Sequence, residues 1–247
     1  MSLGAEPRGP RNRTVVDAAR LHRSRHRRER GQTLIEGPQI LADALTAGFA
    51  VVMAFARIDD TVSFALGDQH GFEVVPVDEP ALARLADTKS PRGPVAIIPI
   101  PEIETRHNGN LLVAHGVSDP GNLGALIRTA AAFGWAVGLT PGAADPWSPK
   151  TMRGAMGGHF RTKLLRFADL DDLTAWTTVA TVVEGGIPPT EVSSGPYAVL
   201  VGEEATGLPS DVADECDVQV TIPMPGGTES LNAGVAAGIV VYELSIR

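Results

Sequence analysis

Three short segments of this 247-residue chain combine glycines with a few polar side chains that could hold a ligand. They are residues 119–124 (DPGNLG), 201–208 (VGEEATGL) and 222–232 (IPMPGGTESLN). Glycine lets the backbone approach a ligand closely, and the first turn of a helix offers free N–H groups to an anion or a polar edge. We therefore expect the three segments to meet in one ligand site.

The first segment leads into a helix that carries a possible anion-binding side chain. Gly121, Gly124 and Arg128 fall at i, i+3 and i+7 on one helix face, so the glycines leave room along which the guanidinium can extend. Asn122 could contact a ligand, or it could cap the helix beside an exposed arginine. Taken alone, this segment leaves both interpretations open.

The other two segments place acidic and amide groups at strand ends. Glu203 and Glu204 follow the apolar run 197–201, and in open α/β sheets ligands bind outside the carboxyl ends of strands. Acidic residues there could instead complement a helix dipole, and Ser230 and Asn232 could be ordinary helix caps. Three such segments, each at a junction between a strand and a helix, favour a shared site.

Apolar runs alternate with helical patterns, which predicts an α/β fold with a mostly parallel sheet covered on both faces. We expect strands at residues 33–36, 50–56, 73–76, 95–100, 110–115, 135–139, 163–166, 178–183, 197–201 and 218–222. We expect helices at residues 14–30 (capped by Thr14), 39–46, in the 60s, at 79–86, 122–133, 149–156 and 170–176, and at the carboxyl terminus.

Composition shifts predict the domain organisation. Pro99, Pro101 and the polar run 102–109 form the best linker candidate. We predict a disordered basic arm at residues 1–13, which are rich in Gly, Pro and Arg, then a small α/β domain at 14–105 and a second domain at 106–247.

The charge is unevenly distributed along the chain. The net charge is −8, but residues 1–31 hold nine arginines against three acidic residues, a net of +6, which leaves −14 for the remainder. A basic segment on an acidic body suits a polyanionic partner held from one end. A solvated helix with disordered flanks would have the same composition, so that alternative stays open.

Composition also bears on the compartment. With 43% apolar and 20% charged residues the chain is typical of globular proteins. Cys216 is the only cysteine, which excludes an internal disulfide and favours a reducing setting. The sequence shows no secretory signal pattern, and the longest apolar run, 233–242, is too short to span a bilayer. We expect a soluble, cytoplasmic protein.

The three segments resemble the motifs of the SpoU/TrmH family of RNA ribose 2′-O-methyltransferases, in the SPOUT superfamily. The family's motifs are N-x-G-x-x-x-R, then G-x-E-x-x-G-L, then I-P-M followed by S-L-N. The matching residues, motif by motif, are Asn122, Gly124 and Arg128; Gly202, Glu204, Gly207 and Leu208; and Ile222, Pro223, Met224, Ser230, Leu231 and Asn232.

The resemblance is close over residues 108–247 and extends to the amino-terminal half. Residues 33–37 (TLIEG) and 87–93 (DTKSPRG) look like the RNA-binding domain of many members, itself similar to a ribosomal-protein fold. Two departures stand out: Ala205 replaces a usual glycine, and Ala233-Gly234 replaces the usual Val-Ser after the asparagine.

The resemblance implies a fold, a cofactor and a partner. The carboxy-terminal SPOUT domain would contain a deep trefoil knot, a rare exception among protein chains. It would bind S-adenosylmethionine mainly through backbone groups, and the chain would form a homodimer through its apolar terminal helix. We assign no metal ion. The cofactor-binding residues would be Gly202, Glu203, Ile222, Met224 and Leu231.

The implied reaction moves a methyl group from a sulfonium to a ribose 2′-oxygen. The residues expected to carry it are Arg128, Asn122, Glu204, Ser230 and Asn232. A guanidinium group holds its proton too tightly to accept another, so Arg128 is a poor general base. We instead expect Arg128 to bind the phosphate next to the ribose and to stabilise the developing oxyanion, while the other four orient Arg128 and the ribose.

Several alternatives remain for the target and for the activity. The separate amino-terminal domain favours 23S ribosomal RNA over tRNA. A non-catalytic RNA-binding or assembly factor could retain the fold. A nucleotide-dependent oxidoreductase is disfavoured because the chain has no G-x-G-x-x-G motif. The sequence does not decide whether the enzyme confers antibiotic resistance.

Overall fold

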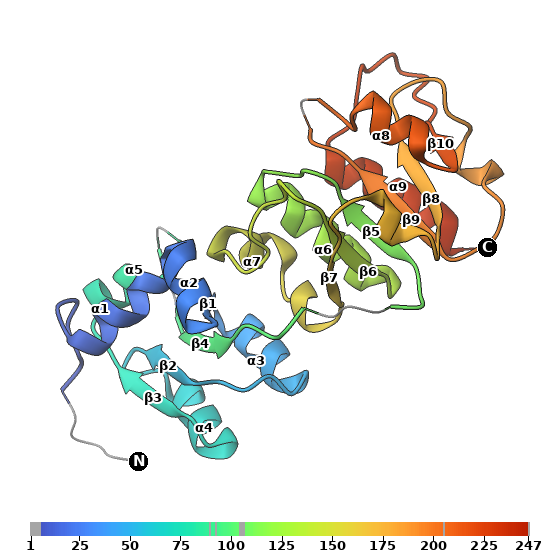
Figure 1. Ribbon diagram of the computed structural model, residues 1–247. Coiled ribbons are helices and arrows are strands. Elements are labelled where there is room, and N and C mark those ends of the chain that lie inside the picture. Colours follow the sequence, from blue (N-terminus) through green and yellow to red (C-terminus); the bar gives the residue numbers. More distant parts are fainter. Residues whose placement is uncertain (1–5, 89, 92, 104–106, 205, 247) are drawn as a thin grey trace. The chain divides into compact units, whose positions relative to one another are not determined.

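A computed structural model describes residues 6–88, 90–91, 93–103, 107–204 and 206–246 (Figure 1). The chain forms two compact units: Met1–Pro101 with Trp147–Arg153, and Glu102–Pro146 with Gly154–Arg247. Helix α7 (Pro149–Ala155) contributes to both. The boundary expected at residues 105 and 106 lies outside the described residues, and that domain assignment stays a prediction.

The first unit is built on a four-stranded sheet in the order β1-β4-β2-β3. Strand β4 pairs antiparallel with β1 and β2, and β2 pairs parallel with β3. The strands are β1 (Gln32–Glu36), β2 (Met53–Ala56), β3 (Glu73–Pro76) and β4 (Val95–Pro99). The helices are α1 (Arg13–Ala19), η1 (Arg20–His22), α2 (Ser24–Arg30), α3 (Pro38–Thr46), α4 (Thr61–His70) and α5 (Glu79–Leu85).

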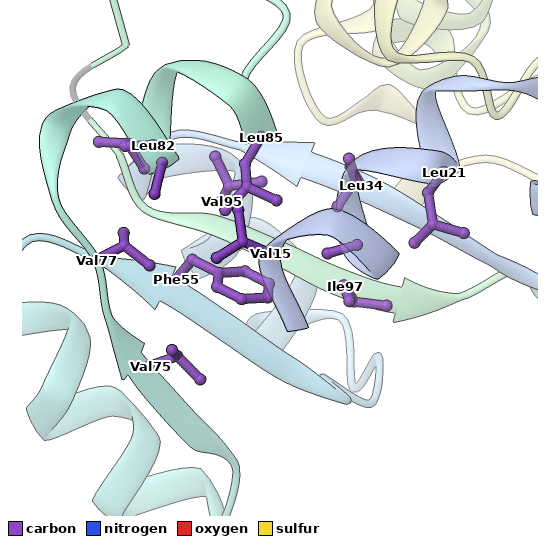
Figure 2. Packing of buried hydrophobic residues seen from close by; sticks show 12 residues of the cluster. Val15, Leu21, Leu34, Phe55, Val75, Val77, Leu82, Leu85, Val95 and Ile97 are labelled. Carbon is purple, nitrogen blue, oxygen red and sulfur yellow. The ribbon is translucent and has the colours of Figure 1, made fainter. Parts of the chain in front are cut away.

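The core of this unit lies between one face of the sheet and the amino-terminal helices. Phe55 and Val95 of the sheet pack in one cluster with Val15 of α1, Leu21 of η1 and Leu82 of α5, and all five side chains are fully buried (Figure 2). Burying a large apolar side chain contributes roughly 1.5–3 kcal/mol. The cluster therefore fixes α1 and η1 against the sheet.

Two expectations for the amino-terminal segment are wrong. Residues 14–30 do not form one helix, because the extended backbone of Arg23 separates η1 from α2, and Asn12 caps α1 in place of Thr14. The stretch from Arg8 onward is not a disordered arm. The Arg8 N–H donates to the Pro76 carbonyl at 2.8 Å, since edge strand β3 leaves backbone groups unpaired.

The two segments that resemble an RNA-binding domain lie together in the first unit. Glu36 ends β1, and its carboxylate accepts the Asp87 N–H at 3.0 Å and the Thr88 hydroxyl. Residues 33–37 and the described part of 87–93 therefore form one local structure; Lys89 and Arg92 lie outside the described residues.

The second unit is built on a six-stranded sheet in the order β10-β8-β9-β5-β6-β7, and every neighbouring pair is parallel. The strands are β5 (Leu111–Ala114), β6 (Ala136–Leu139), β7 (Leu164–Arg166), β8 (Thr177–Thr181), β9 (Tyr197–Val201) and β10 (Val218–Val220). The other helices are α6 (Pro120–Phe133), α8 (Ser210–Glu215), α9 (Ala233–Ser245) and the one-turn η2 (Gly158–Phe160), η3 (Leu170–Leu173) and η4 (Pro189–Glu191).

The expected α/β class with a parallel sheet is confirmed, and the trefoil knot stays a prediction. The helix expected at 170–176 is only the short η3, and the acidic helix α8 was not expected. Within the described ranges, no helix is both long enough and apolar enough to cross a membrane.

Candidate active site

The expected site lies where the neighbouring strands β5 and β9 end. Ala114 is paired with Val201 in parallel register, so the segments that follow the two strands leave the sheet at the same edge. Asp119 then caps α6: its carboxylate accepts the N–H groups of Gly121 at 2.7 Å and Asn122 at 2.9 Å. This cap fixes the backbone that carries Asn122.

The loop after β9 folds back on itself, and two glycines allow it. A Cβ on Gly202 would lie 2.2 Å from the Gly207 carbonyl group and 2.3 Å from the Leu208 nitrogen, so no side chain fits there. The Gly207 N–H donates to the Glu203 carbonyl at 2.8 Å, and Gly207 has a φ of +68°. The Glu203 carboxylate also accepts the Ser118 hydroxyl from the segment after β5.

Asn122, Glu204 and Asn232 form a hydrogen-bonded cluster from three distant parts of the sequence. The Glu204 carboxylate accepts the side-chain amides of Asn122 and Asn232, each at 2.9 Å. Asn232 Nδ2 also donates to Asn122 Oδ1 at 3.0 Å. Hydrogen bonds from Asn122 and then Asn232 hold the pKa of the exposed Glu204 carboxyl below its usual value of 4.5, because they favour the ionised form. The cluster therefore presents a carboxylate at neutral pH.

Asn232 also begins α9. Asn232 Oδ1 accepts the N–H groups of Gly234 at 3.0 Å and Val235 at 3.4 Å. Because the oxygen of this amide caps the helix, its nitrogen faces Glu204 and Asn122. The Ala233-Gly234 departure lies in this first turn of α9, and Ala205 lies outside the described residues.

A pocket of about 240 Å³ opens beside the cluster. Its walls come from the carboxyl ends of β8, β9 and β10, from the loops that follow β9 and β10, and from α9. The lining residues are Thr181, Val182, Val183, Val201, Gly202, Glu203, Glu204, Thr206, Gly207, Val220, Ile222, Met224, Ser230, Leu231, Ala233, Ala236 and Val240. All five residues expected to bind the cofactor are among them, as are Glu204 and Ser230 of the expected catalytic set.

Arg128 and Ser230 do not join the hydrogen-bonded cluster. Arg128 is exposed on α6, and its side chain forms no hydrogen bond or ion pair with any residue that the structure describes. Ser230 is exposed at the pocket rim. The structure thus brings together Asn122, Glu204 and Asn232 and leaves the guanidinium of Arg128 available to a ligand.

Two residues that organise the site were not expected. Asp119 could have been found, since an acidic residue before proline is a common start of a helix. Ser118 carries no such signal, because its contact with Glu203 depends on the pairing of β5 with β9.

Comparisons with known proteins agree with this geometry. Residues 109–242 match the model of the SpoU rRNA Methylase family, and residues 12–96 match the MRM3-like substrate binding domain. The chain is 32% identical to the 23S rRNA (guanosine(2553)-2′-O)-methyltransferase RlmP of Bacillus subtilis strain 168, over 95% of this chain and 96% of that protein.

Solved structures of similar proteins include complexes with a cofactor. The AdoMet-bound rRNA methyltransferase from Sinorhizobium meliloti is 28% identical, with a TM-score of 0.83 over 94% of each chain. AviRb from Streptomyces viridochromogenes, in complex with the cofactor AdoMet, is 25% identical, with a TM-score of 0.84 over 95% of this chain and 97% of that chain. On the match over residues 109–242 and the likeness to RlmP along almost its whole length, this chain belongs to the SpoU rRNA methylase family.

Proposed function

We propose that this protein transfers the methyl group of S-adenosylmethionine to the 2′-oxygen of a ribose in 23S ribosomal RNA. The observation that carries the proposal is the Asn122–Glu204–Asn232 cluster at the rim of a pocket lined by every residue expected to bind the cofactor. The similarity to RlmP favours 23S rRNA as the target.

The residues that line the pocket suit the chemistry of S-adenosylmethionine. Ile222, Met224 and Leu231 supply apolar surface for an adenine ring, and Glu203 offers a carboxylate to the cationic part of the molecule. The loop at Gly202 is packed so tightly that its backbone, without any side chain, borders the pocket. When bound, this cofactor supplies a methyl group already activated by its sulfonium.

The side chains of the site position the nucleophile. Arg128, which has no partner among the described residues, binds the phosphate next to the target ribose and stabilises the charge that develops on the 2′-oxygen. Because a guanidinium is a poor proton acceptor, the proton of the 2′-hydroxyl leaves through that phosphate or through water. Asn122 and Asn232 hold Glu204 ionised and fixed, and together with Ser230 they orient the ribose and Arg128.

A homodimer through α9 completes the proposal. Val235, Ile239, Tyr242 and Ile246 recur at spacings of four, three and four residues, so they form one stripe along the helix, and each is at least 36% exposed. The Tyr242 ring also meets the Phe133 ring of α6 edge to face, which widens the apolar surface. A second copy of the same stripe would cover it in a two-fold arrangement.

We also expect the reaction to take place in the cytoplasm, as the sequence suggests.

Methyl transfer to defined RNAs tests the proposal. Purified protein is incubated with labelled S-adenosylmethionine and either unmodified 23S rRNA or unmodified tRNA, and ribose methylation is mapped by resistance to alkaline cleavage. We expect one methylated position in 23S rRNA and none in tRNA. The reverse pattern would make tRNA the target. Calorimetry that shows no binding of S-adenosylmethionine would favour a non-catalytic factor.

A further inference from the structure

The arginines of residues 1–31 fall into two groups. Five of the nine are engaged: Arg8 with Thr14 and Glu73, Arg13 and Arg20 with Asp17, Arg25 with Glu29, and Arg27 with the carbonyls of Leu21 and His22. The side chains of the other four are exposed and form no hydrogen bond or ion pair with any residue in the described part of the chain: Arg11, Arg23, Arg28 and Arg30.

The acidic groups of these helices are already paired. Asp17 accepts from Arg20 at 2.9 Å, and Glu29 accepts from Arg25 at 2.7 Å and lies 3.3 Å from His26 Nδ1. No carboxylate of α1 or α2 therefore remains to neutralise the free arginines. The positive charge of this segment is available to an external partner.

The free arginines stand on a rigid support. Helix α2 has only seven residues, and a helix this short is unstable by itself in water. Arg27 is 3% exposed and donates to the Leu21 carbonyl at 2.8 Å and the His22 carbonyl at 2.9 Å, which ties α2 to η1. Leu21 of η1 lies in the core (Figure 2), and the His22 ring lies 3.0 Å from the Leu85 carbonyl. These contacts hold the exposed arginines next to Arg27 on a fixed support.

The side of α2 opposite the buried Arg27 faces away from the core. Arg23 and Arg30 are seven residues apart and lie on one flank of α2, while Arg28 lies on the other flank. Guanidinium groups bind phosphate oxygens in pairs of hydrogen bonds, and the remainder of the chain carries a net charge of −14 that repels RNA.

We infer that Arg23 and Arg30, on one flank of α2, form a phosphate-binding surface for the RNA substrate, whereas the engaged arginines of the same segment are structural. The inference rests on the proposed function for the identity of the polyanion. It names the part of the first unit that holds the RNA backbone, and it assigns no base recognition to these residues.

Two matched double variants test the inference. Arg23→Gln/Arg30→Gln removes two free arginines, and Arg20→Gln/Arg25→Gln removes two paired ones, so both lose the same charge from the same segment. Affinity for a 23S rRNA fragment is measured between low and moderate salt. Each lost phosphate contact should lower the slope of log affinity against log salt by about 0.7 to 0.9 and should weaken binding several-fold.

In Arg23→Gln/Arg30→Gln we expect the slope of log affinity against log salt to fall by about 1.5 and the RNA fragment to bind about tenfold more weakly at moderate salt. In Arg20→Gln/Arg25→Gln we expect little change in either quantity. Equal losses in both variants, or none in the first, would overturn the inference; unchanged RNA binding would point to an acidic protein partner. Circular dichroism confirms that each variant is folded. If the wild-type protein binds RNA in this way but methylates none, the proposed function fails and the surface stands.

Discussion

Gly234 of α9 faces Ala125 of α6 so closely that a Cβ atom on Gly234 would lie 2.8 Å from the Ala125 Cβ. These are the helices that carry Asn232 at the cap of α9 and Asn122 in α6, whose side chains meet at 3.0 Å. The glycine at position 234 therefore has a structural reason, because a serine side chain there would not fit against Ala125; nothing in the structure explains Ala233.

Substitution of Gly234 should separate the two asparagines. We expect Gly234→Ala to push α9 from α6 and to reduce methyl transfer about tenfold to a hundredfold, because small displacements of positioning groups cost large factors in rate. Ala125→Gly restores the space, so the double variant should recover most of the activity. A double variant as slow as Gly234→Ala would show that the contact does not act through this spacing.

Arg128 should be needed for the reaction and dispensable for cofactor binding. Arg128→Ala removes the group that we assign to the phosphate and the oxyanion, so we expect methyl transfer to fall at least about 100-fold. Calorimetry should find S-adenosylmethionine binding almost unchanged, because Arg128 does not line the pocket. Near-normal turnover with 23S rRNA would contradict this role.

The ionisation of Glu204 should depend on its two amide partners. Since they lower the pKa of the carboxyl below 4.5, any stability that the cluster adds is present above that pH and is lost as the pH falls through the lowered value. Asn122→Ala and Asn232→Ala should each move the pKa of Glu204 back toward 4.5. Carbon-13 NMR titration of the Glu204 carboxyl measures this pKa. An unchanged pKa in both variants would show that the two asparagines do not hydrogen-bond to Glu204.

His159 should make folding sensitive to mild acid. It is buried in η2 and its Nε2–H donates to the Pro146 carbonyl at 2.6 Å, and burial lowers its pKa from 6.5 to about 4. The unfolded chain takes up the proton first as the pH falls from 6.5 to about 4, so stability decreases across that window, by about 3 kcal/mol at most. In His159→Gln, denaturant titrations should show a flatter pH dependence there.

The α9 stripe should control assembly. Ile239→Glu places a charge in the proposed interface, so we expect the dimer to dissociate at micromolar concentration in analytical ultracentrifugation. Val62→Glu is a matched control, because Val62 is 64% exposed and belongs to the first unit, so it is not part of α9. An unchanged dimer in the first variant, or dissociation in the control, would rule out this interface.

The sequence predicted the shared site because its motif residues are tied to backbone geometry. The folded-back loop requires glycine at positions 202 and 207, and the start of α9 requires a capping residue at Asn232. The residue types in these motifs therefore indicate the local backbone structure of the site. Arg128 was predicted as the arginine of the N-x-G-x-x-x-R motif, although its exposed side chain forms no hydrogen bond or ion pair with the described residues.

The sequence was less informative where long-range contacts decide the structure. The hydrogen bond of the Arg8 N–H depends on edge strand β3, some 70 residues away. The hydrogen bonds of Arg27 to the carbonyls of Leu21 and His22 depend on where η1 ends. Composition therefore predicted disorder for residues 1–13, although the stretch from Arg8 onward is held by contacts with β3.

Asn232 uses both ends of one short amide. Its oxygen starts α9, and its nitrogen holds Glu204 and Asn122. Aspartate would cap the helix but would repel the Glu204 carboxylate, serine would cap it without an amide nitrogen to donate, and glutamine is a poor cap. Asparagine is thus the side chain that caps α9 and also donates to the Glu204 carboxylate. A substitution at position 232 would therefore lose the helix cap, the hydrogen bond to Glu204, or both.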